Sequence, residues 1–228
     1  MSSEVRAGDR RCIFITGAAS GIGRATARLF CARRWFVGAF DLDEAGLAAL
    51  EQELGSEHCL VRRLDVADKA DFDRAMAAFS AATGGRLDLL FNNAGIGAGG
   101  WFEDVPYEVA RRVLEVNFVG VVNGVYAAIP LLQRTPNCLC FSTSSSAALY
   151  GMPRTAMYAA SKFAIRGLTE ALADEFARFG GRAADVSPAL IDTPILETTL
   201  DYTSGGRPGL AMREAATPDG AMRLMQPE

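Results

Sequence analysis

The segment 11–33 most constrains the fold, because it joins a short apolar strand, a glycine-rich turn and a helix. The strand, Arg11–Thr16, contains the run Cys-Ile-Phe-Ile, and Ala25–Arg33 has the composition of a helix. Between them lies Gly17-Ala-Ala-Ser-Gly-Ile-Gly23. A strand, a glycine turn and a helix in this order are typical of the first unit of an α/β sheet that binds a nucleotide.

Each glycine of this turn has a physical use in such a site. Gly17 can make the tight turn, Gly21 lets the backbone approach a pyrophosphate, and Gly23 allows the helix to pack closely on the strand. The N–H groups at the start of the helix, around Ser20 and Ile22, can then donate hydrogen bonds to the phosphates. Any strand–helix turn can contain two glycines, so the motif alone does not establish a nucleotide site.

The next predicted strand, Phe36–Phe40, ends at Asp41. An acidic side chain at this position can accept hydrogen bonds from an adenosine ribose, and it would repel the 2′-phosphate of NADP. Leu42 follows it, and position 20 is Ser20, so no nearby cation is offered to a 2′-phosphate. We therefore expect NAD, with NADP as the alternative. Asp41 could instead cap the following helix, but Asp43 is better placed for that role.

Strands and helices alternate along the whole chain, which predicts one α/β domain with a doubly wound parallel sheet, the Rossmann fold. The later strands are predicted at 59–64, 87–91, 137–143 and 183–186, and the later helices at 43–54, 68–82, 106–129 and 155–179. Pro130 is expected to end the third of these helices. Ligands of such sheets bind beyond the carboxyl ends of the strands, where we expect the site.

Composition excludes several classes of function. A net charge of −4 and a pI near 5.2 argue against a nucleic-acid-binding surface. No membrane span or signal peptide is expected, and the five cysteines suggest buried thiols of a cytoplasmic protein rather than disulfides or a metal site. We expect a polar N-terminal tail at 1–10, a single nucleotide-binding domain at 11–228, and a substrate lid at 194–225.

Tyr158 and Lys162 lie four residues apart on a predicted helix, so both side chains emerge on one face. A nearby ammonium favours the phenolate, which would lower the pKa of Tyr158 and let it exchange a proton with a substrate. The plain alternative is a solvated pair on a helix surface. Asn117, in an apolar helix, also needs hydrogen-bond partners, either at a kink or in an active site.

Together these motifs resemble the short-chain dehydrogenase/reductase family over nearly the whole chain. Thr16–Gly23 matches the family's Thr-Gly-x-x-x-Gly-x-Gly turn, and Asn92-Asn93-Ala94-Gly95 matches its Asn-Asn-Ala-Gly element. Asp65-Val66 matches the pair that meets the adenine, and Tyr158-Ala-Ala-Ser-Lys162 matches Tyr-x-x-x-Lys. The family's spacing selects Ser145 as the catalytic serine, with Ser144 as the alternative, and Asn117 matches its active-site asparagine.

The resemblance implies hydride transfer between a nicotinamide and a secondary alcohol or ketone. Tyr158 would be the general acid and base, Lys162 would lower its pKa, Ser145 would bind the substrate oxygen, and Asn117 would order a water. The implied cofactor-binding residues are Gly17, Ser20, Gly21, Ile22, Gly23, Asp41, Asp65, Val66, Asn93, Ala94, Gly95, Tyr158, Lys162, Pro188, Ile191 and Thr193. The resemblance implies no metal. It implies a homo-oligomer, either a dimer or a tetramer.

Three expectations remain open at this point. An NADP-dependent reductase and a non-catalytic NAD-binding regulator are the alternatives to an NAD-dependent enzyme. Met225–Glu228 looks like the start of a final helix, and the family's last helix and strand are absent, so we expect a shortened chain. Apolar residues around the site suggest a moderately apolar substrate, and Trp101 and Phe102 either line the pocket or anchor a loop.

Overall fold

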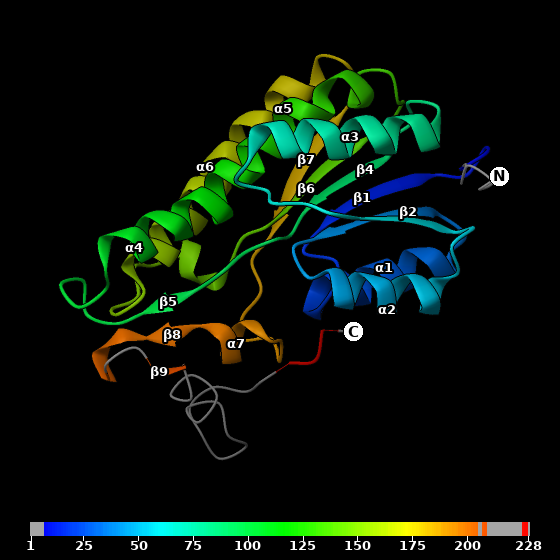
Figure 1. The fold of residues 1–228 in the computed structure, drawn as a ribbon. Helices are drawn as coiled ribbons and strands as arrows, with labels where there is room; N and C mark the ends of the chain where they lie inside the picture. Colours follow the sequence, from blue (N-terminus) through cyan, green and yellow to red (C-terminus); the bar gives the residue numbers. More distant parts are fainter. Residues whose placement is uncertain (1–6, 205–206, 209–224, 228) are drawn as a thin grey trace.

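A computed structural model describes residues 7–204, 207–208 and 225–227, and its centre is a six-stranded parallel sheet. The strand order is β3-β2-β1-β4-β6-β7, with every neighbouring pair parallel (Figure 1). The strands are β1 Cys12–Thr16, β2 Phe36–Asp41, β3 Cys59–Arg63, β4 Leu89–Asn92, β6 Leu139–Thr143 and β7 Arg182–Val186. The predicted doubly wound Rossmann sheet is confirmed.

Helices cover the sheet on both faces, as Figure 1 shows. On one face lie α1 (Gly21–Ala32) and α2 (Glu44–Leu54); on the other lie α3 (Lys69–Thr83), α5 (Gly120–Leu132) and α6 (Ala156–Ala177). α1 begins four residues before the predicted start at Ala25, because the second half of the glycine motif already forms its first turn. Glycine's low helix propensity hides this turn in the sequence.

β1 forms the middle of the core because all five of its residues are buried. Its side chains alternate between the two faces, as the pleat of a strand requires. Phe14 points into the layer of α3, α5 and α6, whereas Ile13 and Ile15 point toward α1 and α2. The Phe14 ring stacks on Phe40 at 3.9 Å between centroids and also contacts Phe72 and Phe79.

The predicted helix after Pro106 is continuous to Leu132, but it is not uniform. α4 (Tyr107–Leu114) runs into a π-helical turn, η1 (Glu115–Val119), and then into α5. Pro130 lies inside α5, so the expectation that it ends the helix was wrong. Burial of Leu131 and Leu132 holds the last turn in place, and this tertiary packing tolerates the one backbone hydrogen bond that proline removes.

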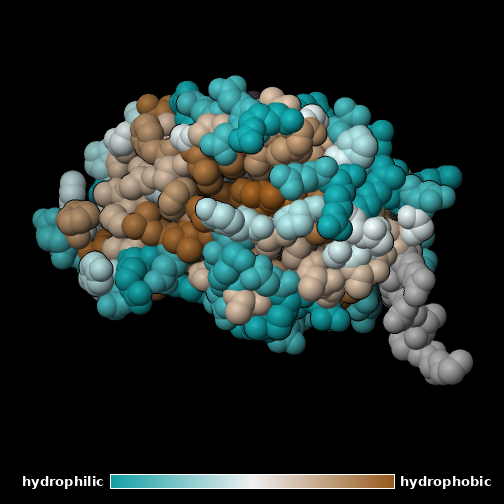
Figure 2. Space-filling view, turned by 90° about the horizontal axis from the view of Figure 1, so that it is seen from above, coloured by the Kyte–Doolittle hydropathy of each residue, from teal (hydrophilic) through white to brown (hydrophobic). Residues whose placement is uncertain are grey.

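By length and hydropathy alone, Tyr107–Leu132 could cross a membrane, which the sequence analysis did not anticipate. Half of its most apolar window is buried inside the protein, where α5 packs on α3 and β4. A buried core helix passes the same test, so the run is weak evidence for a membrane span. Figure 2, which looks down on the layer of α3, α5 and α6, shows apolar surface in the middle of this layer.

A second, small sheet lies beside the carboxyl ends of the main strands and was not predicted. It consists of β5 (Ala98–Gly99), β8 (Leu200–Asp201) and β9 (Arg207–Pro208), and α7 (Ile195–Thr198) precedes β8. The described part of the expected lid at 194–225 is 194–204, 207–208 and Met225; residues 205–206 and 209–224 of that range lie outside the described residues.

The two ends of the described chain also differ from expectation. Met225 does not begin a helix: it forms a parallel bridge with Ile191, and its backbone bonds Leu190 and Asp192. At the other end, Ala7 of the expected polar tail is buried, and its N–H donates to the Ala82 carbonyl at 2.8 Å. Of the five free cysteines, four are buried and Cys31 is partly so.

Phe14→Ala should remove the centre of the aromatic cluster and leave a cavity between β1 and α3. We expect the free energy of unfolding to fall by about 3–5 kcal/mol, measured by urea denaturation. Leu29→Ala on α1 is the control, because Leu29 is 47% exposed and its loss should change stability by no more than about 0.5 kcal/mol. Equal losses in the two variants would contradict the assigned core.

Candidate active site

A cavity of about 790 Å³ lies at the carboxyl ends of the strands, in the size range of cofactor sites. All but two of the residues expected at the site line it. These are Gly17, Ser20, Gly21, Ile22, Asp41, Asp65, Val66, Asn93, Ala94, Gly95, Ser145, Tyr158, Lys162, Pro188, Ile191 and Thr193. The other two, Gly23 and Asn117, are buried behind the lining.

The glycine turn has the geometry that the sequence predicts. Gly17 and Gly21 have φ angles of 66° and 50°, a region that favours glycine. A Cβ on Gly17 would stand 2.9 Å from the Ala94 Cα, and one on Gly23 would collide with the Gly17 carbonyl. The open backbone at the start of α1 therefore fits the phosphates of a dinucleotide, with donors at a helix N-terminus.

Asn93 ties this turn to the neighbouring strands. Its Nδ2 donates to the carbonyls of Thr16 and Gly17 at 3.1 and 3.2 Å, and its Oδ1 accepts from the Thr143 hydroxyl at 3.0 Å. The Thr16 hydroxyl in turn accepts from the N–H groups of Asn93 and Ala94. These bonds join the carboxyl ends of β1, β4 and β6, the strands that carry the cavity.

Asp41 lies at the carboxyl end of β2 and lines the cavity. Its carboxylate accepts from the N–H of Ala19 at 2.9 Å and from that of Asp43 at 3.1 Å. A carboxylate has about four acceptor sites, so it can take further hydrogen bonds from a ribose. Asp43, and not Asp41, caps α2 through the Gly46 N–H, which excludes the capping role for Asp41.

Asp65 also lines the cavity, but its carboxylate is already engaged by a residue that the sequence did not single out. Arg112 of α4 donates to both carboxylate oxygens of Asp65, at 3.1 and 3.0 Å. Arg112 itself lines the cavity. An arginine on a helix, 47 positions from its partner, carries no sequence signal of this contact.

Tyr158 and Ser145 are brought together at the cavity. Tyr158 lies in the first turns of α6, and Ser145 follows β6 and caps a short 3₁₀ turn, η2 (Ser146–Ala148), through the Ala147 N–H. Burial raises the pKa of Tyr158, and its hydrogen bond with Ser145 opposes that shift. Ser144, the alternative, donates instead to the Lys162 carbonyl and has a structural position.

The effect expected of Lys162 on the pKa of Tyr158 differs from what the structure shows. Its Nζ donates to the Thr143 carbonyl at 2.8 Å and lies 5.5 Å from the centroid of the Tyr158 ring. Burial lowers the pKa of Lys162 to about 8. The ammonium was expected to lower the pKa of Tyr158, yet the net shift of Tyr158 is upward. Burial therefore sets the direction of both pKa shifts, because it penalises the charged forms of both groups.

Asn117 lies in the π-helical turn η1 and is fully buried. Its amide holds the backbone of Ile96 from both sides: Oδ1 accepts from the N–H at 2.8 Å and Nδ2 donates to the carbonyl at 3.0 Å. Nδ2 also donates to the Ser161 hydroxyl on α6. The side chain thus positions the loop after β4 against the helix that carries Tyr158 and Lys162.

The model of the short chain dehydrogenase family matches residues 11–202, most of the chain. The chain belongs to the short-chain dehydrogenase family. Its cofactor class is therefore NAD(P), and its chemistry is that of an oxidoreductase.

Relatives of known sequence agree with this assignment. The chain is 32% identical over 216 residues to the oxidoreductase UcpA of Salmonella typhimurium, covering 93% of this chain and 81% of that protein. It is 33% identical over 215 residues to an NAD(+)-dependent 2-dehydro-3-deoxy-L-rhamnonate dehydrogenase of a Sphingomonas species, covering 90% and 85%.

Solved structures are similar as well. A short-chain dehydrogenase/reductase from Burkholderia phymatum, in complex with NAD, is 32% identical with a TM-score of 0.79, over 95% of this chain and 75% of that one. Levodione reductase is 28% identical with a TM-score of 0.84, over 95% and 86%.

The sequence did not predict part of this site, and it suggested residues that lie outside the cavity. Tyr150, Leu190 and Thr198 line the cavity, yet no motif marks them. Trp101 and Phe102, left open between pocket and loop, are 51% and 70% exposed and do not line the cavity. Trp101 closes a turn instead, since its carbonyl accepts from the N–H groups of Asp104 and Val105.

The pKa of Lys162 predicts a pH dependence of stability. The unfolded side chain keeps its proton to about pH 10.5, whereas the folded one loses it near pH 8, so between these values the unfolded state binds more protons. Over this window the contribution of Lys162 to the free energy of unfolding rises with pH, by at most about 1.4 kcal/mol per unit.

This contribution is the difference in unfolding free energy between wild type and Lys162→Met, followed by urea denaturation from pH 7 to 10.5. The difference should rise with pH. Lys69→Met, which removes an exposed lysine paired with Asp73, serves as the control and should show no such rise. A flat difference for Lys162 would mean that its pKa is not lowered.

Proposed function

We propose that the protein is an NAD-dependent oxidoreductase that transfers a hydride between the nicotinamide and a secondary alcohol or ketone. The observation that carries this proposal is the position of Tyr158, Ser145 and Lys162 in the same cavity as the glycine turn and Asp41. A protein that only binds a nucleotide does not need a paired phenol and hydroxyl beside the phosphate site.

The chain's own residues supply proton transfer and charge stabilisation. The Tyr158 hydroxyl gives a proton to the substrate oxygen in reduction and takes one in oxidation. The Ser145 hydroxyl, already bonded to Tyr158, is placed to stabilise the negative charge that develops on that oxygen. When bound, NAD would supply the carbon that accepts or donates the hydride.

Lys162 influences Tyr158 and Ser145 through its positive charge. With a pKa of about 8, it is mostly protonated at neutral pH, although it is buried. Its bond to the Thr143 carbonyl fixes the ammonium beside the Tyr158 ring. Substrate-oxygen charge and phenolate charge are both favoured by a cation held in place within a low-dielectric site.

NAD rather than NADP is favoured by the charges around Asp41. Its neighbours in the cavity wall, Ser20 and Leu42, carry no positive charge. Among the described lining residues, the cations are Lys162, at the catalytic end, and Arg112, which is bound to Asp65. A 2′-phosphate at the end of β2 would therefore meet a carboxylate and no cation.

The substrate end of the cavity favours a moderately apolar compound. Met152, Leu190, Ile195 and Leu196 line the same cavity as Tyr158. Three of these follow β7, in the segment that includes α7, so this segment decides which carbon skeleton fits beside the nicotinamide position. Apolar lining of this kind discriminates between substrates by roughly 1–3 kcal/mol per methylene.

We also propose that the enzyme is a homo-oligomer that associates through the α5 and α6 surface. Val119 in η1, Tyr126 in α5 and Phe163 in α6 are each more than one-third exposed, and Figure 2 shows apolar surface on this side of the molecule. Large exposed apolar side chains gathered on one face are typical of association surfaces.

Tyr158→Phe should remove the proton donor while keeping the ring. We expect kcat for reduction of a ketone to fall by about 10²–10⁴-fold, with the Kd for NADH unchanged. Tyr150→Phe is the matched control, since Tyr150 lines the same cavity and is 59% exposed. Steady-state kinetics and cofactor fluorescence measure the two quantities. Turnover near the wild-type value with normal NADH binding would remove Tyr158 from the mechanism.

Asp41→Ala should change the choice of cofactor. Loss of a charge-assisted hydrogen bond of about 1.5–3 kcal/mol should raise the Kd for NADH by about 10–100-fold, and NADPH should bind relatively better. Asp43→Ala, which removes only the cap of α2, should leave the ratio of the two Kd values unchanged. If the ratio moves equally in both variants, or wild type prefers NADPH, the ribose role is wrong.

A further inference from the structure

The strand order indicates where each part of a dinucleotide would lie in the cofactor cavity. The glycine turn, which fits the phosphates, follows β1, and Asp41, which fits a ribose, lies at the end of β2. Ser145 and the catalytic end follow β6, on the other side of β1. The adenine base therefore belongs beyond Asp41, at the end of the edge strand β3, where Asp65 lines the cavity.

Among the contacts of the described residues, the Asp65 carboxylate keeps one acceptor position for a ligand. Its Oδ1 accepts from the Ala67 N–H at 3.0 Å and from Arg112 at 3.1 Å, and its Oδ2 accepts from Arg112 at 3.0 Å. A carboxylate has about four acceptor positions, two on each oxygen. The remaining position is therefore on Oδ2, in a residue that lines the cavity.

Arg112 holds this carboxylate in one orientation. Both hydrogen bonds to Asp65 come from one nitrogen, Nη2, and Nη1 lies 3.7 Å from the Glu115 carboxylate. Arg112 stands in the last turn of α4, which continues into η1 and α5 without a break. A guanidinium held between two carboxylates on a continuous helix has few other positions open to it, so it fixes the carboxylate that it bonds.

The backbone around Asp65 is held by other residues than Arg112. The Asp65 N–H donates to the Asp71 carboxylate at 2.9 Å. The carbonyl of the next residue, Val66, accepts from the Asn123 amide on α5, also at 2.9 Å. Loss of the arginine side chain should therefore loosen the carboxylate without moving the loop that carries it.

We infer that Arg112 is a positioning residue for the cofactor, which aims the free acceptor of Asp65 at the amino group of adenine. The amino group donates a hydrogen bond, and a carboxylate oxygen accepts it. Hypoxanthine carries an oxygen at the same place, which is itself an acceptor and repels the carboxylate. The pair thus selects an adenine dinucleotide over its hypoxanthine counterpart. This inference rests on the proposed function, because it requires a dinucleotide in the cavity.

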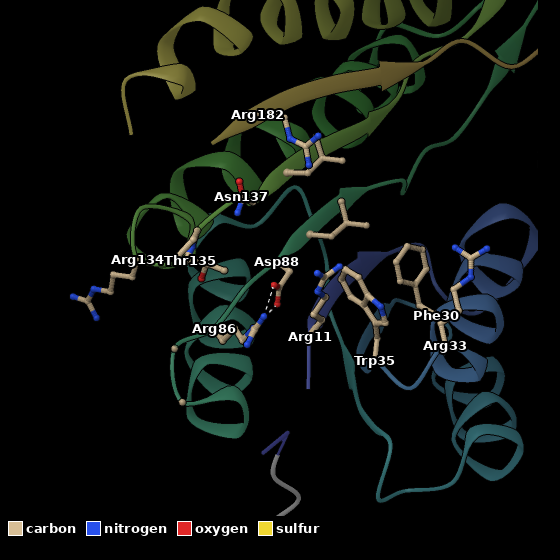
Figure 3. A pocket seen from close by; sticks show the side chains of 15 residues that line it. Arg11, Phe30, Arg33, Trp35, Arg86, Asp88, Arg134, Thr135, Asn137 and Arg182 are labelled. Carbon is tan, nitrogen blue, oxygen red and sulfur yellow. Dashed lines mark hydrogen bonds and ion pairs between the residues drawn. The ribbon is translucent and has the colours of Figure 1, made fainter. Parts of the chain in front are cut away.

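A second arginine–aspartate pair in the same sheet offers a matched control. Arg86 donates two hydrogen bonds to Asp88, at 2.7 and 2.8 Å, beside the start of β4 (Figure 3). Neither residue lines the cofactor cavity. Arg86→Gln therefore removes an ion pair of the same kind, with a similar cost to the fold, and leaves the adenine end of the cavity as it is.

The test compares NADH with reduced nicotinamide hypoxanthine dinucleotide, which differs from NADH only in this purine substituent. Fluorescence of the reduced nicotinamide gives the Kd of each. Wild type should bind NADH about tenfold more tightly than the hypoxanthine dinucleotide, since one hydrogen bond to a charged group distinguishes them. Arg112→Gln should reduce this ratio to about threefold or less. Arg112→Lys, which keeps the charge, should retain part of it.

The ratio of the two Kd values separates positioning from mere stabilisation of the fold. An arginine that only stabilised the fold would weaken both dinucleotides equally, so its loss would leave the ratio unchanged. Arg86→Gln should keep the wild-type ratio, and circular dichroism should show each variant folded. NADH binding with an unchanged ratio in Arg112→Gln, an equal change in Arg86→Gln, or no preference in wild type would overturn this inference alone. Failure of folded wild type to bind NADH would overturn the proposed function and this inference with it.

Discussion

The hydrogen bonds of Asn93 are the constraint on which the rest of the site depends. One amide joins the glycine turn after β1, its own strand β4, and Thr143 at the end of β6. The carbonyl of the same Thr143 receives the ammonium of Lys162. The phosphate end and the catalytic end of the cavity are thus parts of one bonded network, which explains how loops at the ends of three strands keep a fixed geometry.

Burial, more than pairing of charges, sets the chemistry of the catalytic groups. Desolvation raises the pKa of Tyr158 and lowers that of Lys162, so it favours the neutral form of each group. The two ends of the parallel strands differ in the charge of the side chains that lie there. Carboxylates stand at the ends of β2 and β3, whereas guanidinium groups gather where the strands begin.

The sequence predicted the main sheet and the order of its helices and strands, and nearly all the site residues that it predicted line the cofactor cavity. These features depend on local signals, such as the glycine turn, the apolar strands and residues at strand ends. The sequence did not predict the features that depend on contacts between residues far apart in the chain. Arg112 meets Asp65 only through the fold, Pro130 is tolerated because the helix around it is packed, and the pKa of Tyr158 depends on burial that no spacing reveals.

The hydrogen bonds of Asn93 also affect how the protein becomes active after synthesis. Thr16, Asn93 and Thr143 are separated by 77 and 50 positions along the chain, so their bonds close only after large loops have formed. Contacts of this range are slow to form because loop-closure entropy opposes them. Secondary structure should therefore return early in refolding, and cofactor affinity should return with the slowest step, when β6 joins β4.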